Sequence, residues 1–142
     1  MGAIVITGAN RGIGLELARQ LKARGDDVIA VCRAPSAELQ ALGVRIESGV
    51  DVSDASAVIE LAKRLSGVSV DLLINNAGIL RGDKLDAPNF DGIAEQFAVN
   101  AMAPLRVTTA LLPLMSKDGK VAIVTSRMGS IADNGSGGYY GY

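Results

Sequence analysis

The chain has 142 residues, enough for one modest domain that buries roughly 68% of its unfolded surface. Its 14 Lys and Arg against 15 Asp and Glu give a net charge of −1 without a charged block, which favours neither nucleic acid nor an anionic membrane as partner. The sequence has no His, which excludes Ser-His-Asp and Cys-His catalysis and the commonest zinc sites. The single Cys excludes an intramolecular disulfide, and no carboxylates have metal-ligand spacing, so we expect a soluble cytoplasmic protein without a metal site.

Apolar runs rich in β-branched residues predict five strands. The first, fourth and fifth are almost continuously apolar, which is typical of parallel strands covered on both faces. The predicted strands span 3–7, 28–32, 44–46, 70–75 and 121–125.

Helical patterns separate these strands. Gly25 ends a first helix that begins near Ile13, residues 36–42 form a short second one, and Asp54 caps a third that Gly67 ends. A long fourth helix is expected over 89–115. Its apolar face is predicted to carry Phe90, Ile93, Phe97, Ala101, Leu105 and Leu112.

This alternation predicts an α/β fold of the Rossmann type, a doubly wound parallel sheet with strand order 3-2-1-4-5. We expect a single domain over 1–142. The last predicted strand is followed by only a Gly-rich stretch of loop character. It would therefore leave an apolar sheet edge unpaired, so we expect the domain to continue beyond these residues or another chain to cover that edge.

A glycine-rich turn follows the first strand and opens the first helix. Glycines at such a turn let a pyrophosphate approach the backbone, and the helix N-terminus supplies free N–H groups. The spacing G-x-x-x-G-x-G differs from the usual G-x-G-x-x-G, so a plain packing turn is the alternative. The candidate cofactor-binding residues of the turn are Gly8, Asn10, Arg11, Gly12, Ile13 and Gly14.

Further motifs occur in order along the whole chain. Asp51-Val52 follows the third strand, NNAG occupies 75–78 after the fourth, and Val99-Asn100 lies in the long helix. Ser126 and Gly129 form S-x-x-G, before a tyrosine cluster. Together with the glycine turn, these motifs resemble the short-chain dehydrogenase/reductase family, and the stretch from Ser126 to the end resembles its C-factor and carbonyl-reductase-like branch.

The resemblance assigns further cofactor contacts. It implies that Asp51 and Val52 contact the adenine, and that Asn76, Ala77 and Gly78 line the adenosine and the nicotinamide-side ribose. Asp51 would equally serve as a cap for the next helix, and Asn75 is expected to be structural, bonding backbone between strands.

Charge at the end of the second strand bears on the choice of cofactor. An acidic residue there usually holds a ribose 2′-hydroxyl, whereas a 2′-phosphate needs a cation. Here the strand ends Val31-Cys32-Arg33, and Arg11 lies in the glycine turn. Arginine pairs bidentately with phosphate, so NADP(H) is favoured over NAD(H), the alternative being that Arg33 is a solvated loop charge.

The resemblance also implies a catalytic tyrosine. A phenol needs a neighbouring cation to give up its proton near neutral pH, and in this family a Lys four residues after the Tyr supplies it. For Tyr139, Tyr140 or Tyr142, that Lys would lie at position 143, 144 or 146. The long preceding loop favours Tyr142, and Ser126 would donate a hydrogen bond to the substrate oxygen.

Asn100 is singled out on independent physical grounds. Pro104 has no N–H to give to the carbonyl of Asn100, four residues earlier in the helix. A freed carbonyl at a kink is a site for an ordered water, and in the family the matching Asn holds a water of a proton relay. A simple packing kink is the alternative.

The sequence therefore predicts an NADP(H)-dependent short-chain oxidoreductase that moves a hydride between the nicotinamide and a small-molecule carbonyl or alcohol. Its catalytic groups would be Asn100, Ser126 and Tyr142. The alternative is a non-catalytic dinucleotide-binding fragment or sensor without the Y-x-x-x-K lysine. A flavin- or mononucleotide-binding protein is disfavoured, because its phosphate loop does not call for NNAG and S-x-x-G. The family resemblance is compatible with a homo-oligomer.

Overall fold

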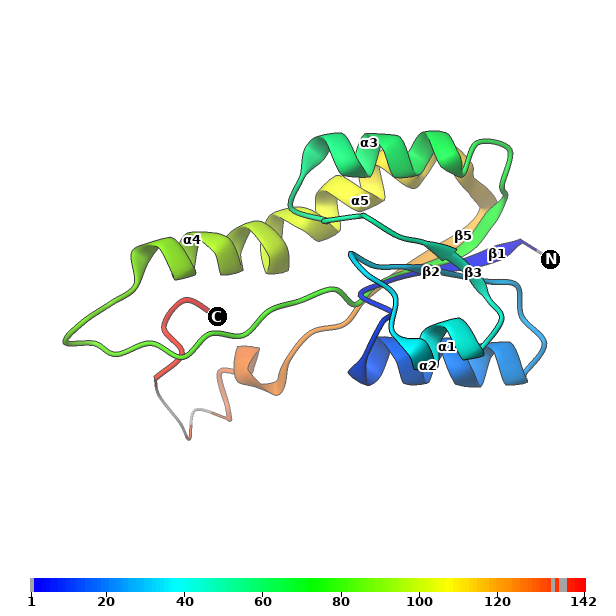
Figure 1. Ribbon diagram of the computed structural model, residues 1–142. Coiled ribbons are helices and arrows are strands. Elements are labelled where there is room, and N and C mark those ends of the chain that lie inside the picture. The colour runs from blue at the N-terminus through cyan, green and yellow to red at the C-terminus, as the bar shows by residue number, and fades with distance from the viewer. Residues whose placement is uncertain (1, 134, 136–137) are drawn as a thin grey trace.

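A computed structural model describes residues 2–133, 135 and 138–142. Five parallel strands form one sheet in the order β3-β2-β1-β4-β5, which confirms the predicted doubly wound fold (Figure 1). The strands are β1 Ala3–Thr7, β2 Val28–Val31, β3 Arg45–Glu47, β4 Val70–Asn75 and β5 Met115–Ile123. The order reverses between β1 and β4, so the carboxyl ends of these two strands meet at a topological switch point.

The fifth strand begins earlier than predicted. Met115 pairs with Val70, the register then shifts, and pairing resumes with Lys120 opposite Leu72. Residues 116–119, Ser-Lys-Asp-Gly, have the composition of a turn. A prediction based on apolar runs therefore placed the start of the strand after them and missed the pair at Met115. Regular pairing over Lys120–Ile123 lies within two residues of the predicted strand.

Helices cover both faces of the sheet (Figure 1). They are α1 Gly12–Ala23, α2 Ala37–Ala41, α3 Ala55–Arg64, α4 Phe90–Phe97 and α5 Ala103–Leu111, with a π-helix η1 Ala98–Met102 and 3-10 turns η2 Leu112–Leu114 and η3 Arg127–Gly129. Ser36, Asp54 and Asn89 cap α2, α3 and α4 with side-chain oxygens that accept a backbone N–H, so the predicted cap at Asp54 is confirmed.

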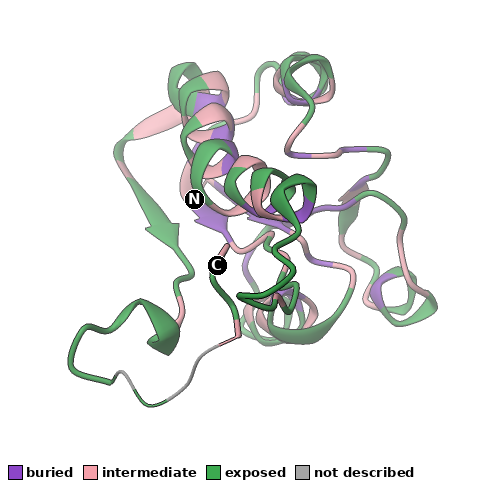
Figure 2. Ribbon diagram, turned by 90° about the vertical axis from the view of Figure 1, so that its left-hand side faces the viewer, coloured by how far each residue is buried: buried purple, intermediate pink, exposed green. Residues whose placement is uncertain are grey.

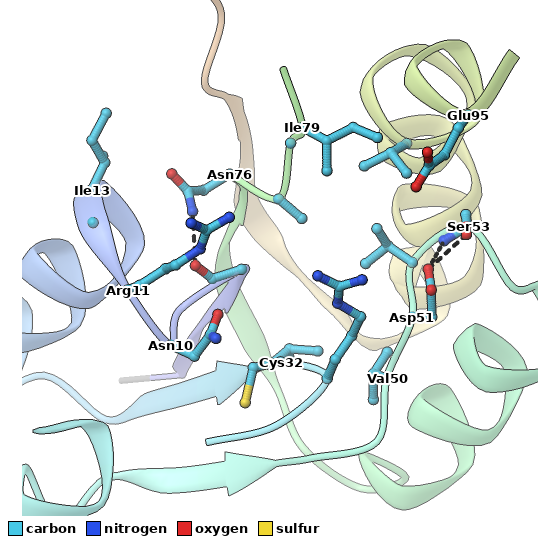
Figure 3. A pocket seen from close by; sticks show the side chains of 18 residues that line it. Asn10, Arg11, Ile13, Cys32, Val50, Asp51, Ser53, Asn76, Ile79 and Glu95 are labelled. Atoms are coloured by element: carbon cyan, nitrogen blue, oxygen red, sulfur yellow. Dashed lines mark hydrogen bonds between the residues drawn. The ribbon is translucent and has the colours of Figure 1, made fainter. Parts of the chain in front are cut away.

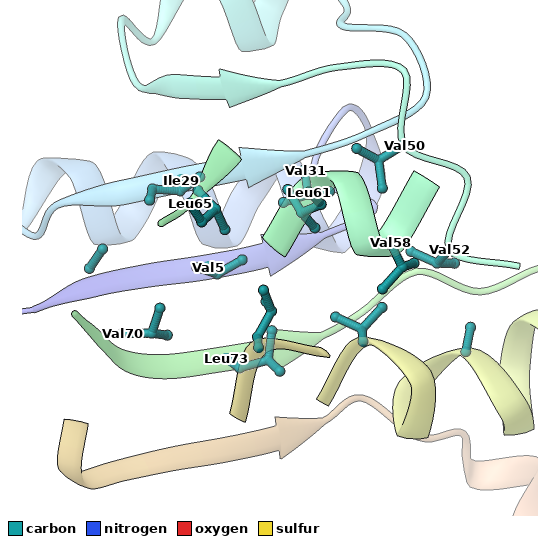
Figure 4. Packing of buried hydrophobic residues seen from close by; sticks show 14 residues of the cluster. Val5, Ile29, Val31, Val50, Val52, Val58, Leu61, Leu65, Val70 and Leu73 are labelled. Atoms are coloured by element: carbon teal, nitrogen blue, oxygen red, sulfur yellow. The ribbon is translucent and has the colours of Figure 1, made fainter. Parts of the chain in front are cut away.

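Two apolar clusters fill the space between the layers. Helices α3 and α5 pack on one face of the sheet, where Leu61, Leu65 and Leu111 are fully buried against strand residues such as Val5 and Leu73 (Figure 4). Helices α1 and α2 pack on the other face through Ala18 and Leu39. Burying both faces explains why β1 is apolar at almost every position.

The predicted long helix is divided. After α4 the chain widens into η1, where the N–H of Ala103 bonds the carbonyl of Ala98, five residues earlier. The helix resumes as α5 with Pro104 in its first turn, where a missing N–H costs little. A π-helical turn just before Pro104 therefore accounts for the irregularity that the sequence predicted at this place.

The buried face of this helical run carries a different set of residues from the predicted apolar stripe. Its buried positions are Gly92, Gln96, Ala103, Val107 and Leu111, whereas Phe90, Phe97, Leu105 and Leu112 are exposed. In Figure 2 buried (purple) stretches of the run alternate with exposed (green) ones. By length and composition alone, the run Phe90–Leu114 would also suffice to cross a membrane. Long apolar helices that pack on a sheet meet the same criteria.

Candidate functional site

At the switch point the Thr7 hydroxyl joins the end of β1 to the turn after β4. Thr7, the last residue of β1, is buried, and its Oγ1 accepts hydrogen bonds from the backbone N–H groups of Asn76 (3.0 Å) and Ala77 (3.1 Å). The chain therefore turns immediately after β4, so that the NNAG motif lies beside the glycine-rich turn.

Asn76 fastens the glycine turn to this point. Its Nδ2 donates to the carbonyls of Thr7 (3.0 Å) and Gly8 (3.2 Å), and a Cβ on Gly14 would lie 2.5 Å from Nδ2 and 2.4 Å from the oxygen of Gly8. Only glycine fits at position 14. The expectation that Asn75 bonds backbone between the strands was wrong: Asn75 bonds the Thr108 hydroxyl on α5 (3.1 Å), and its neighbour Asn76 bridges the strand ends.

A cleft of about 410 Å³ opens at these strand ends, within the usual size range of small-molecule sites. In Figure 3, Asn10, Arg11 and Asn76 lie on one side of it, and Asp51, Ser53 and Glu95 lie on the other. Most of the predicted cofactor residues line this cleft: Gly8, Asn10, Arg11, Gly12, Ile13, Arg33, Asp51, Val52, Asn76, Ala77 and Gly78. Gly14 lies behind the lining, where it lets the turn pack against Asn76.

Asp51 is oriented by Ser53. It does not cap the next helix, because the N-cap of α3 is Asp54. The Asp51 Oδ1 accepts the Ser53 hydroxyl (2.6 Å) and the Ser53 N–H (2.9 Å). These two bonds, foremost the hydroxyl, lower the pKa of Asp51, and the charge of nearby Arg33 acts in the same direction. The carboxylate therefore stays ionised at the cleft wall, with Arg33 near it.

The three predicted catalytic residues come from three different elements. Asn100 lies in η1, and its side chain bonds both backbone groups of Ile79: Oδ1 accepts the N–H (2.9 Å) and Nδ2 donates to the carbonyl (2.8 Å). Ser126 follows β5, and its Oγ accepts the N–H of Met128 (3.1 Å). Tyr142 lies in a turn, its N–H bonded to the carbonyl of Tyr139 (3.1 Å). None of these three residues lines the cleft, although Val99, the neighbour of Asn100, does.

Further cleft residues were not among the predicted ones: Val31, Cys32, Val50, Ser53, Ile79, Glu95 and Val99. Most of them lie close in the sequence to a predicted residue, after the carboxyl ends of β2, β3 and β4. Ligands of open α/β sheets bind at these strand ends, so taking every residue there as a candidate would have found them. Glu95 lies in α4, where only the packing of the helix brings it to the cleft. Burial raises the pKa of the Cys32 thiol.

The family model of short chain dehydrogenases matches residues 2–141. This chain is a member of the short chain dehydrogenase family. It is 43% identical over 144 residues to 1-hydroxy-2-glutathionyl-2-methyl-3-butene dehydrogenase of Rhodococcus sp. (strain AD45), an alignment that covers 100% of this chain and 64% of that protein. With the C-signal of Myxococcus xanthus it shares 47% identity over 76 residues, which is 51% of this chain and 46% of the other.

Among solved structures, a carbonyl reductase from Pseudomonas aeruginosa PAO1 in complex with NADP is 35% identical, with a TM-score of 0.89. The alignment covers all of this short chain dehydrogenase and 69% of that reductase. These likenesses agree with the predicted C-factor and carbonyl-reductase-like branch of the family. In the part of the chain that the structure describes, no group of three or more His, Cys, Asp and Glu is placed to hold a metal ion.

Proposed function

We propose that this short chain dehydrogenase binds NADP(H) in the cleft and acts on a small-molecule carbonyl or alcohol. The observation that carries the proposal is the position of Arg33: it lines the cleft two residues after the end of β2, where a dinucleotide's 2′ substituent is recognised in this fold. Arg11 adds a second cation to the lining. The bound NADP of the related Pseudomonas reductase supports the same choice.

The residues present fit a dinucleotide. Gly12 lines the cleft with a φ of 55°, and a Cβ there would meet nothing within 4 Å, so the backbone is open towards a ligand. The turn runs into the N-terminus of α1, whose unpaired N–H groups suit a pyrophosphate. Asp51 offers an ionised acceptor to the adenine side.

Bound NADP(H) would supply or accept the hydride. Ser126 would orient the substrate, because its Oγ lone pair is used by the Met128 N–H and its own O–H is left to donate to the substrate oxygen. Tyr142 would carry the proton at its phenol oxygen. Asn100 would serve through its backbone carbonyl, since its side chain is occupied by Ile79.

The test is a titration of the chain with NADPH and with NADH, followed by nicotinamide fluorescence, with a generic aldehyde or diketone added in the same cuvette. Tighter binding of NADPH supports the cofactor site. Binding without turnover supports the alternative of a dinucleotide-binding unit without activity of its own, and binding of neither cofactor overturns the proposal.

A further inference from the structure

The segment after the NNAG motif runs along the helix that faces it. Asn100 bonds the backbone of Ile79 as described, and one helical turn earlier the Gln96 Oε1 accepts the N–H of Arg81 (2.9 Å). Gln96 and Asn100 are four helical residues apart, which is about 6 Å along the helix. Their partners Ile79 and Arg81 are two extended residues apart, which is about 6.6 Å, so the two spacings match. Residues 79–81 are therefore fixed to α4 and η1 by two amide side chains.

Gln96 is unusual among the residues of this run because its polar side chain is only 1% exposed. Burying an amide is costly unless hydrogen bonds replace its water. On the surface beside it, the Arg81 guanidinium pairs with both carboxylate oxygens of Glu95 (2.7 and 2.8 Å). Glu95 and Ile79 line the cleft, so this connection forms part of the cleft wall.

The tyrosine-bearing segment 138–142 docks on the same place from outside. The N–H of Asp83 donates to the carbonyl of Gly138 (2.8 Å), and Figure 1 shows the C-terminal segment crossing the loop between β4 and α4. Gly141 lies against α4: a Cβ there would be 2.6 Å from Ile93 Cγ1 and 2.9 Å from Gln96 Nε2. The two ends of the Gln96 amide thus face different partners, the cleft wall and the tyrosine segment.

From this arrangement we infer that Gln96 is a positioning residue, which fixes the tyrosine segment to the wall of the cofactor cleft and so couples the two. The coupling rests on the proposed function, whereas the docking of the segment does not. Because coupling between sites is reciprocal, cofactor binding strengthens the docking of 138–142, and undocking the segment weakens cofactor binding.

The chain carries its own reporter for this test. It has three tyrosines, at 139, 140 and 142, and no tryptophan, so intrinsic fluorescence arises only from the docked segment. Acrylamide quenching of that emission measures how accessible the segment is, and NADP+ titration measures the cleft. Both are read on the full chain.

Two variants undock the segment from opposite sides. Gln96→Leu removes the amide, and Gly141→Ala adds the Cβ that collides with Ile93. Their controls are Gln40→Leu, at an exposed position of α2, and Gly135→Ala, where a Cβ meets nothing within 4 Å. Circular dichroism checks the fold, and Gly141→Ala keeps the test decisive if Gln96→Leu fails to fold.

We expect both variants to raise the acrylamide quenching constant about twofold, and to weaken NADP+ binding about fivefold, the lower end of typical couplings. Wild-type protein and controls should show quenching that falls when NADP+ binds. Unchanged quenching and unchanged NADP+ affinity in both variants would overturn the inference. If wild-type protein binds no NADP+, the proposed function fails, and the quenching of the free proteins still decides the role of Gln96.

Discussion

The Thr7 hydroxyl accepts two backbone hydrogen bonds at the switch point. Replacing Thr7 by Val keeps the shape and leaves the N–H groups of Asn76 and Ala77 without their acceptor. We expect a loss of about 2 kcal/mol in the free energy of unfolding, measured in urea, since unpaired buried donors are expensive. Thr109→Val, at an exposed hydroxyl of α5, should change it by less than about 0.5 kcal/mol. Equal effects of the two variants would contradict this role for Thr7.

The bond between Ser53 and Asp51 gives a pH-dependent prediction. The folded state lowers the pKa of Asp51, so this carboxylate contributes stability that is present above its unfolded pKa and is lost as pH falls through the folded one. Ser53→Ala removes the strongest of the causes. It should cost about 1 kcal/mol at pH 7, and the difference from wild type should shrink in acid, below the unfolded pKa near 4. Ser66→Ala, at an exposed position, should show no such pH dependence in urea unfolding.

The residues that line the cofactor cleft were predictable because the sequence motifs lie at the carboxyl ends of the predicted strands. Gly8 and Asn76 directly follow a strand, Arg33 lies two residues after one, and parallel strands bring their carboxyl ends together. Which of two adjacent asparagines bridges β1 and β4 was not predictable. Positions 75 and 76 carry the same residue type, so the sequence does not distinguish them. The direction in which the backbone leaves β4 decides which side-chain amide faces Thr7 and Gly8.

At the scale of elements, four of the five strands and the first three helices follow from periodicity and caps, whereas the orientation of the α4–α5 run does not. The run is apolar around much of its circumference, and the π-helix η1 shifts the phase between its halves. Phe90, Phe97 and Leu105 fit a helical stripe as well as the buried set does, yet they are exposed. Packing against α3 and the sheet decides which face of α5 is buried, and this packing cannot be predicted from a single sequence.

Leu111 and Leu105 test the orientation of α5 directly. Leu111 is 0% exposed and packs in the cluster with α3, whereas Leu105, on the same helix, is 68% exposed. Leu111→Ala should lower the free energy of unfolding by about 3 kcal/mol, because it leaves a cavity. Leu105→Ala should change it by less than about 0.5 kcal/mol. A larger loss for Leu105→Ala, measured by urea unfolding at low protein concentration, would mean that α5 packs through the other face.

At the scale of the whole molecule, the sheet edge at β5 is the main departure from a closed fold. Within the residues that the structure describes, β5 pairs with β4 alone, and Val121, Ile123 and Val124 are exposed. The chain spans 64% of its Rhodococcus relative and 69% of the Pseudomonas reductase. Unpaired apolar edges pair readily with other strands, so we expect this edge to pair with a second copy of the chain in solution.

Sedimentation velocity tests this expectation. The 142-residue chain should self-associate as its concentration rises, and Ile123→Lys should reduce the associated fraction, because an edge lysine opposes strand pairing. Ile59→Lys, at an exposed position of α3 away from the edge, should leave association unchanged. If the chain stays monomeric at high concentration, the expectation that the edge of β5 pairs with another strand is wrong.

Recognition of a 2′-phosphate by Arg33 is measured by the dissociation constants of NADPH and NADH for wild-type protein and Arg33→Ser. A charged hydrogen-bond pair contributes about 1.5–3 kcal/mol, so the variant should bind NADPH roughly tenfold to a hundredfold more weakly while its affinity for NADH stays the same. Equal losses for both cofactors, or no loss for either, would contradict this role of Arg33.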